Sequence, residues 1–159
     1  MELLVDKDEK YLFNKLKYLL PKKGHFIEIG ARDGKDHCYT LCKEKWSGHC
    51  IEANPDIAVE LKKTYENNNN IKCFNYAITN EDKNVTFYIE SNHNSGTSSL
   101  YKSRANATDA KLNRHIKKEV TVLGKKLNTF VEEENIKECD LLLTDCEGED
   151  VNILLSTDF

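Results

Sequence analysis

Residues 26–34 read Phe26-Ile27-Glu28-Ile29-Gly30-Ala31-Arg32-Asp33-Gly34, an apolar run that ends in a carboxylate and then a glycine turn. The apolar run predicts a β-strand, and the Gly-x-x-x-Gly spacing predicts a tight turn into the next helix. Such a unit presents free backbone N–H groups and a helix N-terminus to a small molecule, because glycine lets the ligand approach the backbone closely. We therefore expect a cofactor site at this turn of an α/β fold.

The spacing of the glycines indicates which cofactor fits this turn. Dinucleotide folds use Gly-x-Gly-x-x-Gly, whose second glycine leaves room for the pyrophosphate. Here Arg32 occupies the place of that glycine, and the next glycine is Gly34. The bulky side chain disfavours NAD, so a nucleotide-dependent oxidoreductase is the least favoured of the alternatives.

A second carboxylate, Glu52, ends the apolar run before Asn54-Pro55. It lies roughly 20 residues after the glycine turn, and a carboxylate at this spacing often binds the ribose of a cofactor. Its two oxygens can accept hydrogen bonds from both ribose hydroxyls. The alternative is that Glu28 and Glu52 are only solubilising charges at strand ends. An adenosine without phosphates fits both the carboxylate and the crowded turn. We therefore predict S-adenosylmethionine as the cofactor, with its amino-acid end at the glycine turn.

Strand and helix patterns alternate along the rest of the chain. Helical periodicity over 8–20 predicts a leading helix within residues 1–24. The elements predicted after it are strands at 25–30, 48–52, 71–77, 85–89, 120–123 and 141–144, and helices at 35–46, from Asn54-Pro55, at 127–134 and from about Gly148. This order predicts an α/β fold with a Rossmann-like open, mostly parallel sheet and flanking helices, in a single domain over 1–159 whose cofactor-binding core is 25–159.

Asp145 follows the most apolar of these strands, which we expect to be buried on both faces of the sheet. Its place at a strand end puts it in the crevice where such sheets bind ligands. Three roles are open for its carboxylate: a catalytic base for an acceptor hydroxyl, a cation ligand together with Glu147, or a cap of the helix near Gly148. The metal role is the weakest of the three, because Asp-x-Glu is only part of a hard-cation ligand set.

The order and spacing of these motifs resemble the FkbM-type methyltransferases, a group of S-adenosylmethionine-dependent enzymes with a Rossmann-like sheet. The matching segments are Glu28-Ile29-Gly30-Ala31-Arg32-Asp33-Gly34, Glu52-Ala53-Asn54-Pro55, Ala77-Ile78, Gly96-Thr97-Ser98-Ser99-Leu100, Lys126-Leu127-Asn128 and Thr144-Asp145-Cys146-Glu147-Gly148-Glu149-Asp150. The resemblance implies methylation of an oxygen on a small-molecule or carbohydrate acceptor.

Site residues follow from the strand ends and from this resemblance. We predict cofactor contacts by Glu28, Gly30, Ala31, Gly34, Glu52, Ala53, Ala77 and Asp145. The resemblance also implies that Ser98 and Ser99 belong to a loop that closes over the substrate, with Glu147 beside it, although a serine-rich turn is the structural alternative.

Three positions depart from the family's pattern. Asn128 stands where the family usually has Asp, Asp150 where it usually has Glu, and Ala53 where Pro is common. A rival interpretation is therefore a module that binds S-adenosylmethionine without catalysis. A full sheet of this class continues with further C-terminal strands, so we expect strand 141–144 to have an exposed edge on which a second copy of the chain could pair.

Composition limits the remaining functions. A net charge of −4 and a pI near 5.8 argue against nucleic-acid binding through a basic field. The sequence has neither a signal-peptide pattern nor an apolar run of about 18 residues, which predicts a cytoplasmic protein without a membrane partner. The six cysteines lack Cys-x-x-Cys spacing, so we expect reduced thiols rather than a zinc site. The five histidines show no pairing that suggests a metal site or a catalytic triad.

A long polar segment, 90–118, separates two predicted strands. It contains a basic cluster with one acid, Asp109, and its members are Lys102, Arg104, Lys111, Arg114, Lys117 and Lys118. The cluster is either a solvated helical face or a basic lid that selects an anionic acceptor.

Overall fold

The computed structural model describes residue 15 and residues 18–90, 97–102 and 116–158. The predicted helix over 8–20 lies almost entirely outside the described residues, as do Arg104, Lys111 and Arg114 of the basic cluster. Within the described part of the chain, no helix has the length and apolar character needed to cross a membrane.

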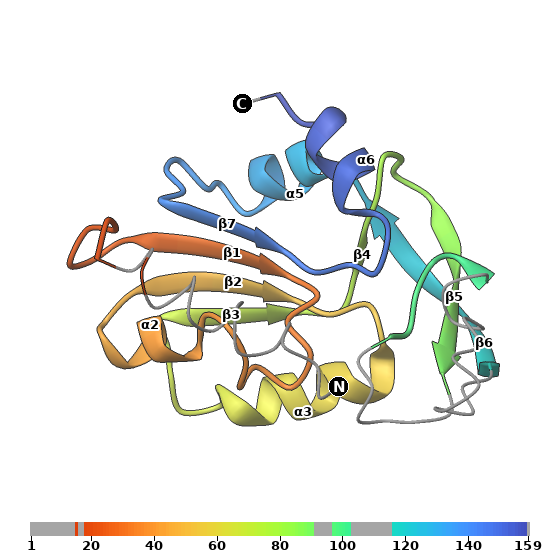
Figure 1. Cartoon of the computed structure of the whole chain (residues 1–159), viewed down its shortest axis with the longest axis horizontal. Helices are drawn as coiled ribbons and strands as arrows, with labels where there is room; N and C mark the ends of the chain where they lie inside the picture. The colour runs from red at the N-terminus through yellow and green to blue at the C-terminus, as the bar shows by residue number, and fades with distance from the viewer. Residues whose placement is uncertain (1–14, 16–17, 91–96, 103–115, 159) are drawn as a thin grey trace.

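Four strands form a parallel sheet in the order β3-β2-β1-β7. They are β1 (His25–Ile29), β2 (Ser47–Ile51), β3 (Ile71–Phe74) and β7 (Leu141–Thr144). Figure 1 shows their arrows side by side, with all carboxyl ends at one edge. The chain adds β2 and β3 on one side of β1 and β7 on the other, so the strand order reverses next to β1, where such sheets bind ligands.

Helices cover both faces of this sheet (Figure 1), namely α2 (Tyr39–Lys43) and α3 (Pro55–Thr64) on one face and α5 (Leu127–Glu133) and α6 (Asp150–Leu155) on the other. Alternation along β1 explains the two layers, because successive side chains of a strand point to opposite faces. Phe26 packs with Leu41 and Leu61, whereas Ile27 packs with Phe130 and Ile153. The predicted α/β fold with a Rossmann-like, mostly parallel sheet is confirmed.

A second sheet lies beyond the carboxyl ends of the first (Figure 1). It has the order β4-β6-β5, with β4 (Ala77–Ile78) parallel and β5 (Asn84–Glu90) antiparallel to β6 (Ile116–Lys125). The single strand predicted over 71–77 is wrong, because Asn75 interrupts it. The Asn75 side-chain amide donates to the backbone oxygens of Glu52 and Ala53, at 2.8 and 3.1 Å. The chain therefore leaves the first sheet after β3 and enters the second.

Two other elements differ from their predictions. Helix α2 is shorter than the predicted 35–46. The carbonyls of Asp33 and Gly34, just before the predicted helix, accept hydrogen bonds from the Thr64 and Tyr65 hydroxyls, both at 2.6 Å. These carbonyls are therefore not part of a helix. Strand β6 is longer than the predicted 120–123, since it pairs with β5 along its length.

Side chains of strand β7 pack on both faces of the sheet, Leu141 and Leu143 on the α2 and α3 side and Leu142 on the α5 and α6 side, but they are less buried than the sequence predicts. Strand β7 is an edge strand of the first sheet, and each of its four residues is half-buried. Within the described residues β7 is the last strand of this sheet, and the pairing of its edge with a second copy of the chain stays a prediction.

Candidate functional site

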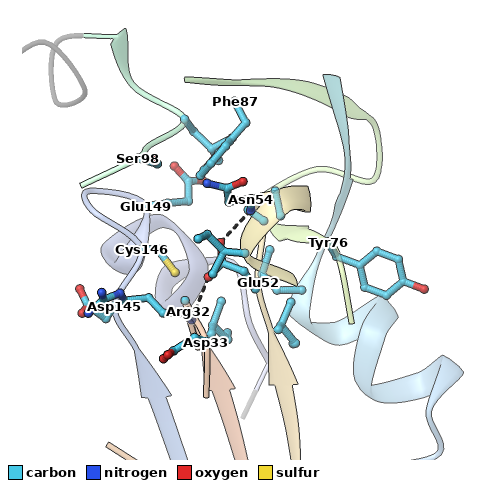
Figure 2. Close-up of a pocket in the computed structure, with 18 of the residues that line it drawn as sticks. Arg32, Asp33, Glu52, Asn54, Tyr76, Phe87, Ser98, Asp145, Cys146 and Glu149 are labelled. Carbon is cyan, nitrogen blue, oxygen red and sulfur yellow. Dashed lines mark hydrogen bonds between the residues drawn. The ribbon is translucent and has the colours of Figure 1, made fainter. Parts of the chain in front are cut away.

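A pocket lies between the carboxyl ends of the parallel sheet and the second sheet. One wall consists of residues that follow β1, β2 and β7, and the opposite wall comes from β4, β5 and the segment after residue 97. Figure 2 shows Glu52 and Arg32 in the first wall and Phe87 and Ser98 in the second. Of the predicted site residues, Gly30, Glu52, Ala53, Ala77, Ser98 and Asp145 line this pocket.

The backbone N–H groups of the glycine turn are used within the protein. Those of Gly30 and Ala31 donate to the Ile51 carbonyl, at 2.9 and 3.0 Å. That of Arg32 donates to Glu52 Oε2 at 2.9 Å, and that of Gly34 donates to the Ala31 carbonyl at 2.9 Å. The expectation of free N–H groups is therefore wrong for these four residues. An anion such as pyrophosphate would have to break these bonds.

Gly30 brings two loops of the pocket together. Its φ is +83°, and a Cβ atom at this position would lie 2.0 Å from the Asp145 carbonyl oxygen. The Asp145 N–H donates to the Ile29 carbonyl at 2.9 Å, which fixes the loop after β7 against the end of β1. Only glycine leaves space for this approach and adopts this φ without strain.

Gly34 has a different role, since it does not line the pocket. Its φ is +76°, and a Cβ atom there would lie 2.5 Å from the Tyr65 ring. Ala31, another predicted cofactor contact outside the pocket lining, is fully buried in the core on the same face. Both residues pack the turn against the α2 and α3 layer.

Glu52 is a buried carboxylate that lines the pocket directly after β2. Its Oε1 accepts the Asn54 N–H at 2.7 Å, and its Oε2 accepts the Arg32 N–H at 2.9 Å, as Figure 2 shows. Burial raises the pKa of Glu52, and these N–H donors oppose the shift. Each oxygen has a further lone pair, so both can still accept a hydroxyl from a ligand.

Glu28 is also buried, but it does not line the pocket. Its Oε1 accepts the Cys38 N–H at 3.3 Å, and the Cys50 thiol lies 3.9 Å from its Oε2. Burial raises the pKa of Glu28 to about 7. The two strand-end carboxylates therefore have different surroundings, and only Glu52 faces the pocket.

The loop after β7 is held by Asp150. Its carboxylate accepts the Cys146 N–H at 2.9 Å and the Gly148 N–H at 3.4 Å. The residue at the N-cap of α6 is Glu149, not Asp145. The N-cap position considered for Asp145 is therefore that of Glu149, and Asp145 is exposed at the pocket wall.

The segment around Ser98 and Ser99 connects the two walls. Ser99 forms a β-bridge with Tyr88 of β5, and its hydroxyl donates to the Glu147 carbonyl at 2.9 Å. Ser98 lines the pocket, whereas Ser99 and Glu147 do not. Ser99 and Glu147 therefore position the wall in which Ser98 lies.

Acidic side chains dominate the charge of the described pocket lining. Five carboxylates line it, against one guanidinium, that of Arg32: they are Asp33, Glu52, Glu60, Asp145 and Glu149. The Arg32 guanidinium is itself paired with Asp36 at 3.0 Å, and Asp33 is paired with Lys35 at 2.9 Å, so the excess negative charge of the lining comes from the other four carboxylates. Because opposite charges attract and like charges repel, this pocket favours a cationic ligand over an anionic one.

Several lining residues were not predicted as site residues from the sequence, chiefly Glu149, Asn54, Tyr76, Phe87 and Leu100. Glu149 occurs within the quoted motif, but at a position where the family pattern has no fixed residue. Phe87 alternates with polar neighbours in its strand, which indicates a buried side chain without saying what it faces. Only the meeting of the two sheets makes these residues neighbours.

The basic cluster does not form a lid over this pocket in the described part of the chain. The Lys102 ammonium lies 3.5 Å from the Glu119 carboxylate, and Lys117 and Lys118 belong to β6. None of these three lysines lines the pocket. Among the residues that the structure describes, no group of three or more His, Cys, Asp or Glu side chains is arranged to hold a metal ion.

Comparison with known proteins gives one match. The family model described as Methyltransferase FkbM domain matches residues 28–159. No curated protein and no solved structure matches the chain. The matched range begins at Glu28 and includes every residue that lines the pocket.

Proposed function

The chain belongs to the FkbM methyltransferase family, and from this premise we propose that it transfers a methyl group from S-adenosylmethionine to an acceptor oxygen. The observation that carries the choice of cofactor is the charge of the pocket, five carboxylates against one paired guanidinium. S-adenosylmethionine carries a positive sulfonium, a positive ammonium and one carboxylate, so it is a net cation, whereas NAD carries two phosphates. The internally bonded glycine turn also disfavours phosphate binding.

The residues of the pocket fit the parts of this cofactor. The Glu52 carboxylate would hold the ribose hydroxyls, because both of its oxygens keep a lone pair for them. Ala77, Ile78 and Phe87 would supply an apolar surface for adenine. When bound, the cofactor supplies an activated methyl group on a positive sulfur.

We assign Asp145 to the proton of the acceptor hydroxyl. It lies in the pocket wall at the sheet's switch point, and the N-cap residue of α6 is Glu149. A positioned carboxylate that accepts a proton typically contributes about 10²–10⁴-fold to a rate.

Two of the departures from the family pattern are outside the pocket. Asn128 bonds to Asp158, with its amide donating at 3.1 Å, and Asp150 holds the loop after β7. Neither residue lines the pocket. The rival interpretation, a binding module without catalysis, therefore draws little support from them.

Isothermal titration calorimetry with S-adenosylhomocysteine and NAD tests the cofactor. We expect binding of S-adenosylhomocysteine and none of NAD. Glu52→Gln should weaken binding at least about tenfold, because a charged hydrogen bond contributes about 1.5–3 kcal/mol. Glu28→Gln is the matched control, since it changes a buried strand-end carboxylate outside the pocket. Binding of NAD by the wild type, or equal losses in the two variants, would contradict the proposal.

A further inference from the structure

We propose that the methyl acceptor binds in a second pocket next to the first and that it is a neutral, hydroxyl-rich molecule of the sugar class. This inference rests on the proposed function and specifies its substrate. The second pocket lies along β5, between the turn before this strand and α6. Leu100 and Glu149 line both pockets, so the two meet at these residues. The reacting hydroxyl of the acceptor would extend past this junction into the first pocket, whose lining includes Asp145.

The side chains of the second pocket have the chemistry that a sugar needs. Three amides (Asn80, Asn84 and Asn152) and two phenols (Tyr88 and Tyr101) line it. Amides donate and accept hydrogen bonds, as sugar hydroxyls do, and aromatic rings cover the apolar C–H face of a sugar ring.

Glu149 is the central polar group of this junction. Its Oε2 accepts the Tyr101 hydroxyl at 2.6 Å and the Asn152 amide at 3.2 Å, and the same amide donates to the Tyr101 oxygen at 2.9 Å. No hydrogen bond within the described residues reaches Oε1. The Glu149 side chain is 5% exposed, so this carboxylate is fixed in place. Figure 2 shows it on the same side of the first pocket as Ser98 and Phe87.

The charge of Glu149 decides between neutral and anionic acceptors. A phosphate or carboxylate at the junction would meet a buried negative charge, and like charges in contact are unfavourable. The one cation of the second pocket's described lining, Lys83, is paired with Glu81. A hydroxyl, by contrast, can donate directly to Glu149. The geometry thus disfavours the anionic acceptor that a basic lid would select.

Saturation-transfer difference NMR tests the proposal on the full chain with S-adenosylhomocysteine present. The neutral probes are the methyl glycosides of glucose, mannose and fucose, and the anionic probes are glucose 6-phosphate and glucuronate. We expect transfer to at least one neutral glycoside and none to the anions. Tyr101→Phe should weaken binding about three- to tenfold, because the hydroxyl that orders Glu149 is lost. Tyr39→Phe, the matched control, removes a phenol hydroxyl outside both pockets and should leave binding unchanged.

Glu149→Gln provides an independent test of the charge argument. With the negative charge removed, glucuronate should gain affinity relative to its neutral counterpart. The proposal is overturned if no neutral glycoside receives saturation, if the anions bind better to the wild type, or if Tyr101→Phe and Tyr39→Phe behave alike. Calorimetry on the same sample separates the two hypotheses. Glycoside binding without S-adenosylhomocysteine binding would reject methyl transfer and retain the sugar site.

Discussion

Replacing Glu28 with Gln should make the protein less sensitive to pH. Glu28 is 2% exposed, and burial raises its pKa to about 7 from an ordinary value of 4.5. In the unfolded chain this carboxyl loses its proton near pH 4.5, whereas in the folded protein it keeps the proton until about pH 7. Folding therefore becomes less favourable as the pH rises through this window.

The size of the effect follows from the two pKa values. A difference of about 2.5 pKa units, from 4.5 to about 7, corresponds to at most about 3.5 kcal/mol, since one unit is worth about 1.4 kcal/mol. The full contribution is present below pH 4.5 and is lost once the pH has passed 7. Between pH 5 and pH 8 we expect Glu28→Gln to gain about 2–3 kcal/mol in unfolding free energy relative to the wild type.

Urea unfolding of both proteins at pH 5 and pH 8 measures this difference. Terms that do not depend on pH, such as the changed hydrogen bond to the Cys38 N–H, cancel when the two pH values are compared. Other titrating groups, including His49, whose pKa burial lowers to about 4, are present in both proteins and cancel as well. An equal stability difference at the two pH values would show that Glu28 titrates normally and that the reasoning is wrong.

Three further substitutions test the loops of the pocket. Gly30→Ala should lower the melting temperature, because the new Cβ would lie 2.0 Å from the Asp145 carbonyl oxygen and a positive φ costs a non-glycine residue about 1–2 kcal/mol. An unchanged melting temperature would contradict the close approach of these two loops. Asp150→Ala should cost about 1–3 kcal/mol in chemical unfolding, because the N–H groups of Cys146 and Gly148 lose their acceptor. Asp145→Asn should leave stability within about 0.5 kcal/mol and lower turnover with a confirmed acceptor, and wild-type turnover would remove its assigned role.

The sequence predicts the layers of this protein well and the second sheet poorly. The boundaries of β1, β2 and α3 follow from apolar runs, from the glycine turn and from Asn54-Pro55, which are local signals. The break after β3 has no such signal, because it depends on the Asn75 amide reaching the carbonyls of Glu52 and Ala53. The contact between His25 and His49, whose ring nitrogens are 2.8 Å apart, likewise depends on the pairing of two strands.

The same limit explains why Glu28 and Glu52 look equivalent in the sequence. Glu28 follows Phe26-Ile27 and Glu52 follows Cys50-Ile51, so each ends a similar apolar run. In the structure, Glu28 is paired with Cys50 within the sheet, whereas Glu52 comes one residue after the end of β2. Side chains alternate between the faces of a strand, so Glu28 points with Phe26 toward the α2 and α3 layer. Glu52, past the last pair of the ladder, faces the pocket. Strand register, which no single motif specifies, thus separates the carboxylate that we expect to change stability with pH from the one that we propose to bind a ribose.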